Sequence, residues 1–407
     1  MDRDELAAWL RLTLTPGVGN SSARKLLAAF GLPQAVFEQS ASALAQVLSS
    51  PQVSALRSMP PELEALLATT WAWLQQDEPQ GIRRRVVALG DSGYPQALLN
   101  LEDPPLLLYL LGSAEFTPNS AEEPINQAQI APNNIASHTI DPSRSLAVVG
   151  SRNPTPQGAA NAQRFAKAMA QAGLTIVSGL ALGVDGAAHA GALEGAETQA
   201  SGLTVAVVGT GLDRVYPKAH RDLAHRIAKR GLLVSEYPLG TPPLMANFPK
   251  RNRLIAGLSN GTLVVEAALK SGSLITARLT SEQGKEVFAI PGSIHAAQSR
   301  GCHALIKQGA KLVESAQDIL EELRWPLSLQ TTSNSIASGA LSTSATGVFD
   351  SNSLLLEALG FDPVGLDALQ ARCGLNTSDL QAQLMGLELD GLVARLPGGL
   401  FQRQAPA

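Results

Sequence analysis

The sequence predicts an α/β protein centred on an extended Rossmann-like parallel sheet, with an N-terminal helical domain and a C-terminal winged helix. Three observations favour this class. From Ser145 onward, short runs of Val, Ile and Leu alternate with segments of helical length. Residues 1–80 have helical periodicity and little strand character, and residues 351–407 have the pattern of three helices followed by a hairpin. The alternation is typical of strands buried on both faces of a parallel sheet.

Length and composition indicate a soluble, multidomain protein. The 407 residues are too many for one ordinary core, and we expect about two to four domains. Hydrophobic residues make up 45% of the chain and charged residues 16%, as in most globular proteins. No apolar run reaches the roughly 18–20 residues of a membrane span. The start, MDRDELAAWL, is acidic where a signal peptide is basic, so we expect a cytoplasmic protein.

Metal and cofactor motifs are not found in the sequence. The two cysteines, Cys302 and Cys373, lie far apart, which supports neither a disulfide framework nor a zinc site. The six histidines do not pair with carboxylates or thiols at ligand spacing. Gly209 and Gly211 lack the third glycine of the dinucleotide fingerprint, and there is no P-loop motif. We therefore predict no metal and no cofactor.

Charge is unevenly distributed along the chain. The net charge of −4 argues weakly against coating of a polyanion, but residues 214–230 contain six cations and one acidic residue. A local basic patch is sufficient for electrostatic capture of a polyanion.

The N-terminal domain, residues 1–80, contains a glycine turn between two helical segments. Residues 14–19 read LTPGVG, and the Pro-Gly-x-Gly turn is similar to that of helix-hairpin-helix (SAM-like) DNA-binding domains. A plain turn between two helices explains the same residues. Both interpretations stay open, and with them the question whether this turn contacts DNA.

The central domain, residues 81–325, begins with strand-like segments at 85–89 and 106–110. Residues 113–144 are polar and aperiodic, and we predict a disordered surface insertion there. Residues 326–350 are rich in Ser, Thr and Ala and have the composition of a linker to the winged helix.

From Ser145 the predicted strands form a regular series. They lie at 146–149, 174–177, 205–208, 232–234, 263–265, 287–290 and 311–313. Most of them end in small residues, such as Gly150 and Ser151 after the first and Ser178 and Gly179 after the second. The carboxyl ends of parallel strands share one edge, which is where open α/β sheets bind ligands.

The stretch 248–277 has the composition of a site for a ligand with several phosphates. Three cations, Lys250, Arg251 and Arg253, precede a buried strand, and Gly272 and Ser273 follow it. A Gly/Ser turn that opens a helix presents free N–H groups to an anion. Arg152, after the first strand, is a second candidate for a bidentate phosphate contact. A solvated cationic turn, and an arginine at the sheet edge, are the structural alternatives.

Three further polar residues admit a catalytic interpretation. Asp185 and His189 follow a glycine-spaced loop, and we favour structural roles for both, as a helix cap and a packed residue. Glu266 follows a strand in GTLVVE, which resembles nucleotide-handling Rossmann proteins of the lysine-decarboxylase-like type. A nucleotide N-glycosidase or phosphoribohydrolase is therefore the alternative function. The glycine run that such enzymes place before this glutamate is missing.

Seven segments, in order, resemble the DNA-processing protein A family, also called DprA or Smf. They are GSRNPTPQG, SGLALGVDGAAH, AVVGTGLDRVYP, SEYPLG, FPKRNRLIAGLSNGTLVVEA, SGSLITA and AIPGS. The segment YPQALLNLEDPPLLLYLLG and the C-terminal unit also agree with the family, so the resemblance covers nearly the whole chain. The insertion at 113–144 and the long linker depart from its compact pattern.

The resemblance implies a DNA-binding protein, and the missing metal ligands and activated nucleophile predict that it has no catalytic activity. It implies binding of single-stranded DNA, a homodimer built on the Rossmann domain, and loading of the RecA recombinase onto incoming DNA in natural transformation (competence). Phe248 is a candidate for stacking on a base. The residues of this sequence that are implied in DNA binding are Ser151, Arg152, Gly179, Phe248, Lys250, Arg251, Asn252, Arg253, Gly272, Ser273 and Thr276.

Overall fold

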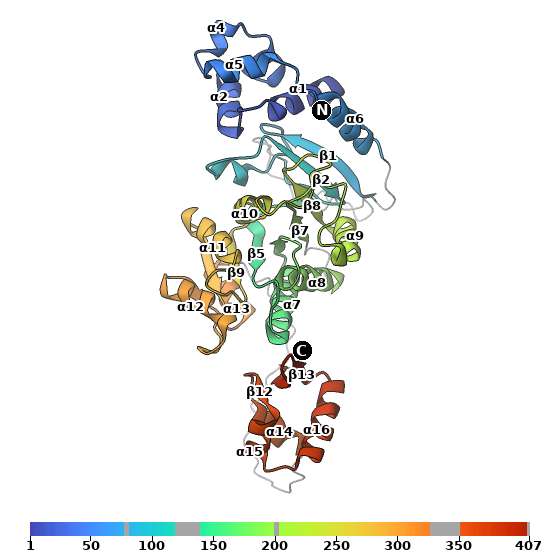
Figure 1. Cartoon of the computed structure of the whole chain (residues 1–407), viewed down its shortest axis with the longest axis vertical. Coiled ribbons are helices and arrows are strands. Elements are labelled where there is room, and N and C mark those ends of the chain that lie inside the picture. Colours follow the sequence, from blue (N-terminus) through green and yellow to red (C-terminus); the bar gives the residue numbers. More distant parts are fainter. Residues whose placement is uncertain (77–80, 119–138, 199–202, 326–350, 405–407) are drawn as a thin grey trace, which may run out of the picture.

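The computed structural model describes residues 1–76, 81–118, 139–198, 203–325 and 351–404. It confirms the α/β class. Figure 1 shows helices α1–α6 against the β1–β2 side of a large twisted sheet and further helices along that sheet. No helix of the described ranges is both long and apolar enough to cross a membrane.

The N-terminal domain consists of helices, as predicted. They are α1 (Arg3–Leu14), α2 (Asn20–Phe30), α3 (Pro33–Phe37), α4 (Ala41–Leu44), α5 (Ser50–Arg57) and α6 (Leu63–Leu74). The predicted glycine turn joins α1 to α2. Gly17 has a φ of +77°, a conformation that favours glycine, and its carbonyl accepts a hydrogen bond of 2.7 Å from Gln52.

The central sheet has nine strands in the order β1-β2-β8-β7-β6-β5-β9-β10-β11. The strands from β8 to β11 in this order are parallel, whereas β1 and β2 are antiparallel additions at the β8 edge. Their bounds are β1 (Arg83–Ala88), β2 (Leu107–Gly112), β5 (Ser145–Val149), β6 (Thr175–Ser178), β7 (Thr204–Val207), β8 (Leu232–Ser235), β9 (Gly261–Val264), β10 (Glu286–Ala289) and β11 (Lys311–Leu312).

The strand order reverses between β5 and β9. From β5 the chain proceeds outward through β6, β7 and β8, and it then returns to the other side of β5 for β9, β10 and β11. Such a reversal leaves a crevice at the carboxyl ends of the two inner strands, because their connections diverge to opposite faces. The fold therefore places the ligand edge at the ends of β5 and β9.

Helices cover both faces of the sheet. On one face Leu146 and Val148 of β5 share a core with α7, α8 and α13, and on the other Ala147 and Val149 share a core with α10, α11 and α12. This two-sided burial explains the uninterrupted apolar strands of the sequence. The helices are α7 (Pro156–Gln171), α8 (Val184–Thr198), α9 (Arg221–Arg230), α10 (Asn247–Gly257), α11 (Ser273–Glu282), α12 (Arg300–Lys307) and α13 (Ala316–Glu322). Short 3-10 turns are η2 (Gln96–Asn100), η4 (Pro142–Arg144), η5 (Lys218–His220) and η6 (Ala297–Ser299).

The helical domain and the sheet share one hydrophobic core. Trp73 of α6 packs edge-on against Tyr109 of β2, with 6.3 Å between ring centroids. The core that contains Leu6, Leu26 and Leu56 continues into Val86 and Leu107 of the sheet. The predicted boundary near residue 80 therefore separates two patterns of secondary structure that are packed together.

The prediction of disorder was wrong for both ends of the segment 113–144. Residues 115–116 form β3 (Glu115–Phe116), which pairs in parallel with β4 (Thr139–Ile140). Phe116 and Ile140 are buried in the core that includes β2 and β8. Two isolated apolar residues give too short a pattern to indicate a strand. The middle of the segment, 119–138, lies outside the described residues, as does the predicted linker 326–350.

The C-terminal unit has the predicted winged-helix content. Its elements are α14 (Ser351–Leu359), β12 (Val364–Gly365), α15 (Leu366–Cys373), α16 (Thr377–Leu389), β13 (Val393–Leu396) and β14 (Leu400–Arg403). The second helix begins at Leu366, because the two preceding residues form β12 and pair with Phe401 and Leu400 of the wing. Leu369, Leu384 and Phe401 belong to its own core.

Candidate nucleic-acid interface

A pocket of about 550 Å³ opens where the strand order reverses. It is formed by the segments that follow β5, β6 and β7, together with the first turns of α10 and α11. Because the carboxyl ends of β5 and β9 meet here, this is the ligand position expected of an open α/β sheet. The lining residues are Val149, Gly150, Arg152, Ala181, Asp185, Tyr216, Pro243, Met245, Phe248, Pro249, Arg251, Asn252, Ile255, Ser271, Gly272, Ser273 and Thr276.

One end of the pocket is the N-terminus of α11. Gly272 is the N-cap residue and has no side chain to cap the helix, and the first turn contains no acidic residue. Asn252 Nδ2 donates to the Gly272 carbonyl at 3.2 Å, which ties α10 to this turn. Ser273 and Thr276 line the same end. The first N–H groups of this turn already have acceptors, since Ser273 N donates to the Ser271 hydroxyl at 3.4 Å and Leu274 and Ile275 N donate to the Ser271 and Gly272 carbonyls at 3.2 and 3.1 Å. The partial positive charge of the helix N-terminus still suits a phosphate.

Arg152 supplies an exposed cation to the pocket. Its guanidinium lies 5.5 Å from the centroid of the Phe248 ring, and within the described residues it has neither an ion pair nor a hydrogen bond. The neighbouring Ser151 is not among the lining residues. Its hydroxyl accepts a hydrogen bond of 3.1 Å from the backbone N–H of Asn153. Arg152 is therefore free to bind a phosphate, whereas Ser151 shapes the turn that carries it.

Arg251 lies at the floor of the pocket and is 4% exposed. Its Nη1 donates to the Val207 carbonyl at 2.7 Å, and its Nε is buried without a hydrogen-bond partner among the described residues. Burial lowers the pKa of Arg251, the Asp185 carboxylate opposes that shift, and the positive charge of Arg152 adds to it. Two guanidiniums thus repel each other in one pocket, and a bound anion would relieve the repulsion.

Gly179 and Asp185 hold the Arg251 guanidinium in place. A Cβ atom at Gly179 would overlap with Nη1 of Arg251, so a larger residue there would displace the guanidinium. The Asp185 carboxylate accepts hydrogen bonds from the backbone of Gly179 at 3.1 Å and Ala181 at 3.3 Å. Burial raises the pKa of Asp185, while Arg251 and these donors lower it. Asp185 thus has a structural role, but the prediction that it caps a helix was wrong, because it lies within the first turn of α8 and binds the loop that precedes the helix.

The cations of the central stretch divide between two sides of α10. Phe248, Arg251, Asn252 and Ile255 follow helical spacing and line the pocket. Lys250 and Arg253 are three apart on the helix and are not among the lining residues. The expectation that all three cations meet one ligand did not allow for the helix, in which adjacent residues point in different directions.

Arg253 is already paired inside the molecule. Its guanidinium forms an ion pair with Glu236, and it lies 4.0 Å from Asp103. Both side chains of the Arg253–Glu236 pair are largely buried. Asp103 also accepts hydrogen bonds from Asn20 and Arg24 of α2, at 3.0 and 3.1 Å. Arg253 thus connects α10 to the helical domain, and the structure does not bring it to the pocket.

An aromatic pair forms the rim of the pocket, and the sequence analysis identified only half of it. The rings of Tyr216 and Phe248 are 5.7 Å apart with an interplanar angle of 33°. Tyr216 is 44% exposed. The chain has only four tyrosines, and Tyr216 lies late in the loop between β7 and η5, so its exposed aromatic ring was the one available signal.

Glu266, the residue on which the hydrolase interpretation depended, does not line the pocket. Its carboxylate accepts hydrogen bonds from the backbone N–H and the hydroxyl of Thr155, at 2.9 and 2.5 Å. Burial raises the pKa of Glu266, and the Thr155 donors oppose the shift. Thr155 is the N-cap residue of α7, so Glu266 supports a helix end. Among the described residues no three His, Cys, Asp or Glu side chains cluster as a metal site would require.

His189 is fully buried and packs as the structural interpretation expected. Its Nδ1 lies 2.7 Å from the Thr204 hydroxyl, which itself donates to the Ile176 carbonyl. The His189 Nδ1–H is therefore the donor and the ring is neutral. Burial, with lesser effects of nearby cationic groups, lowers the pKa of His189 from 6.5 to about 3.

The buried His189 predicts a loss of stability in acid. Below pH 6.5 His189 becomes protonated in the unfolded chain, whereas in the folded chain it stays neutral down to about pH 3. The unfolding free energy therefore falls as the pH falls from 6.5 towards 3. Between pH 6.5 and 5 we expect a decrease of about 2 kcal/mol in the unfolding free energy. Urea unfolding followed by circular dichroism measures it. His189→Gln should flatten the dependence, and exposed His225→Gln should not; equal slopes in both variants would contradict the assignment.

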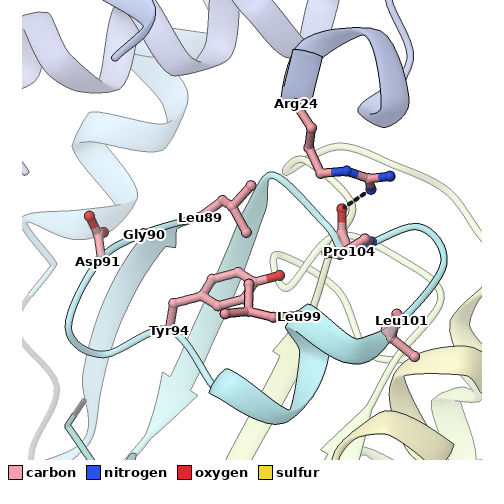
Figure 2. A pocket seen from close by; sticks show the side chains of 8 residues that line it. All are labelled: Arg24, Leu89, Gly90, Asp91, Tyr94, Leu99, Leu101 and Pro104. Carbon is pink, nitrogen blue, oxygen red and sulfur yellow. Dashed lines mark hydrogen bonds between the residues drawn. The ribbon is translucent and has the colours of Figure 1, made fainter. Parts of the chain in front are cut away.

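A second cavity, of about 410 Å³, lies between α2 and the loop after β1. Figure 2 shows Arg24 above it and Tyr94 and Leu99 at its floor. Its polar side chains have partners within the protein: Arg24 binds the loop that contains Asp103, Asp91 accepts from the Ala88 N–H, and the Tyr94 hydroxyl donates to the Pro105 carbonyl. This cavity offers a ligand fewer free polar groups than the pocket at the strand ends.

Two family models match the chain. The model of the DNA recombination-mediator protein A matches residues 136–324, and that of the DprA winged helix domain matches residues 346–399. The first contains every residue of the pocket, and the second contains most of the C-terminal unit.

Several known proteins are similar to this chain. Protein Smf of Escherichia coli is 45% identical over 257 residues, which span 62% of this chain and 66% of that protein's length. Protein Smf of a Synechocystis species is 34% identical over 354 residues, 81% of each chain. The X-ray structure of DNA processing protein A from Streptococcus pneumoniae aligns with 79% of this chain and 98% of its own, with 34% identity and a TM-score of 0.60.

Proposed function

The chain belongs to the DNA-processing protein A (DprA/Smf) family, and on that premise we propose that it binds single-stranded DNA at the pocket between β5 and β9. One observation carries the proposal. At the switch point of the sheet, the pocket combines the N-terminus of α11, an Arg152 guanidinium without an ion pair among the described residues, and an aromatic rim. Phosphate and base are the two parts of a nucleotide that such groups recognise.

The pocket chemistry favours a single strand over a duplex. An aromatic side chain stacks on a base only if the face of that base is free, and the faces of paired bases are covered by their neighbours. The described lining offers no row of amide side chains to read base edges, so we expect little sequence preference. Binding then depends on backbone charge and stacking.

The nucleotide hydrolase is the less supported function. Glu266 is engaged by Thr155, and Asp185 is engaged by two backbone N–H groups and neighbours Arg251. In the described lining of the pocket we identify no pair of nucleophile and base in hydrogen-bond contact. We therefore propose a binding protein without turnover of its own.

We further propose that the chain acts in DNA processing during natural transformation, as a homodimer that loads RecA onto the bound strand. The family model names a recombination mediator, which supports this role. For the dimer, exposed apolar side chains near the β10–β11 end of the sheet, Ile294 at 73% and Leu312 at 45%, supply surface that a second copy would cover. Light scattering on the full chain tests the dimer, and growth of RecA filaments on protein-coated single strands tests the loading.

We expect the protein to bind single-stranded DNA more tightly than duplex DNA, and a comparison of the two affinities tests the proposed function. Fluorescence anisotropy with a labelled oligonucleotide, alone and annealed to its complement, gives the two dissociation constants at one salt concentration. A parallel assay follows release of free base or phosphate from nucleoside monophosphates. Equal affinity for both DNA forms together with steady hydrolysis that Glu266→Ala abolishes would favour the hydrolase instead.

A further inference from the structure

We propose that Tyr216, and not Phe248, is the surface on which a DNA base stacks, and that Tyr216 sets the preference for single strands. This inference rests on the proposed function and assigns one of its specificity-determining residues. Tyr216 is the exposed member of the aromatic pair at the rim of the pocket, with 44% of its surface accessible, whereas Phe248 is half-buried beneath it.

Phe248 also lines the pocket, but neighbouring groups cover much of its ring. Its ring lies 5.7 Å from the Tyr216 ring, which is the separation of two rings in direct contact. The Arg152 guanidinium lies 5.5 Å from its centroid, and the Gly209 backbone lies beside an edge of the ring. Phe248 therefore serves as a support that orients both Tyr216 and Arg152.

The segment that carries Tyr216 is fixed before any ligand binds. Leu212 is buried in the core, and the Asp213 carboxylate accepts a hydrogen bond of 2.8 Å from the Gly240 N–H. On the other side of Tyr216, His220 Nδ1 lies 3.0 Å from the Leu180 carbonyl in the loop after β6. A platform held in this way loses little conformational entropy when a base stacks on it.

The position of Tyr216 relative to the phosphate end explains how it would select strands. Tyr216 lines the same pocket as Gly272 and Ser273, so a nucleotide whose phosphate lies at the α11 N-terminus brings its base toward the rim. Only an unpaired base can turn its face onto the ring. A duplex can satisfy the phosphate contacts but not the stacking contact, and it loses that part of the affinity.

A comparison of base-bearing and abasic strands tests this inference. Tyr216→Ala should lower affinity for a base-bearing oligonucleotide about 5- to 150-fold and leave affinity for an abasic strand of equal length unchanged. Tyr216→Phe keeps the ring and should bind both strands like the wild type. Quenching of a 2-aminopurine base in the strand should occur with the wild type and Tyr216→Phe, and not with Tyr216→Ala. Because Tyr216 is exposed, thermal unfolding should be the same for all three proteins.

Two results would overturn the inference, and they differ from failure of the proposed function. If Tyr216→Ala weakens binding of base-bearing and abasic strands equally, or of neither, Tyr216 is not a base platform. If Phe248→Ala removes the base-dependent part of binding while Tyr216→Ala keeps it, the platform is Phe248. If the wild-type protein binds no single-stranded DNA at all, the proposed function itself fails and the inference falls with it.

Discussion

Replacing Arg251 with methionine is expected to lower the free energy of unfolding of the central domain by about 1–3 kcal/mol, the usual effect of leaving a buried polar group without its partner. Methionine has a similar length, but it leaves Asp185 buried without its opposite charge and the Val207 carbonyl without its donor. The Arg251 charge lowers the pKa of the buried Asp185 carboxylate without forming a direct ion pair with it, so removing Arg251 alone leaves that carboxylate less stabilised. The double variant Arg251→Met/Asp185→Asn should therefore recover part of the loss.

Urea unfolding followed by far-UV circular dichroism measures this effect. Lys250→Met is the matched control, since Lys250 is the preceding residue on the same helix, is exposed and loses the same charge. We expect it to change stability by less than about 0.5 kcal/mol. Similar unfolding midpoints for Arg251→Met and Lys250→Met would show that Arg251 does not support the floor of the pocket.

Replacing Arg152 with alanine is expected to weaken binding of single-stranded DNA by about 1–3 kcal/mol, or 5- to 150-fold. Arg152 is the exposed guanidinium of the pocket, and charge-assisted bonds to phosphate are among the stronger hydrogen bonds. Arg152→Lys keeps the charge but loses the bidentate geometry, so its affinity should lie between those of the wild type and the alanine variant.

Stability separates this effect from a folding defect. Arg152 has no internal hydrogen bond or ion pair among the described residues, so Arg152→Ala should unfold at the wild-type temperature. Anisotropy titrations at a single salt concentration give the affinities. A variant that binds like the wild type, or that loses affinity only because it unfolds, would remove Arg152 from the site.

The sequence was sufficient to predict the sheet and its ligand edge. Runs such as 146–149 and 263–265 are apolar without interruption because both faces of these strands are covered, and small residues follow them because the pocket lies there. Gly272, Ser273 and Arg152 could be placed from this pattern alone. Their placement depends only on where the strands end, and the local sequence marks those ends clearly.

The sequence was a poorer guide to which side of α10 each cation lies on. Lys250, Arg251 and Arg253 form one basic run in the sequence, and only the helix separates Arg251 from the other two. The partner of Arg253 is Glu236, 17 positions away, and no local pattern connects them. Tyr216 was missed for a similar reason, because its contact with Phe248 joins the loop after β7 to α10, and no local pattern connects the two.

The salt dependence of single-strand binding tests the central claim most directly. The logarithm of the binding constant should fall linearly with the logarithm of salt concentration, with a slope of roughly −0.7 for each phosphate contacted. Arg152→Ala should reduce the magnitude of this slope by about one contact. Lys307→Ala removes the same charge from an exposed position in the last turn of α12, away from the pocket lining, and should leave the slope unchanged. Identical slopes and affinities for the wild type and Arg152→Ala would contradict the claim that DNA binds at the ends of β5 and β9.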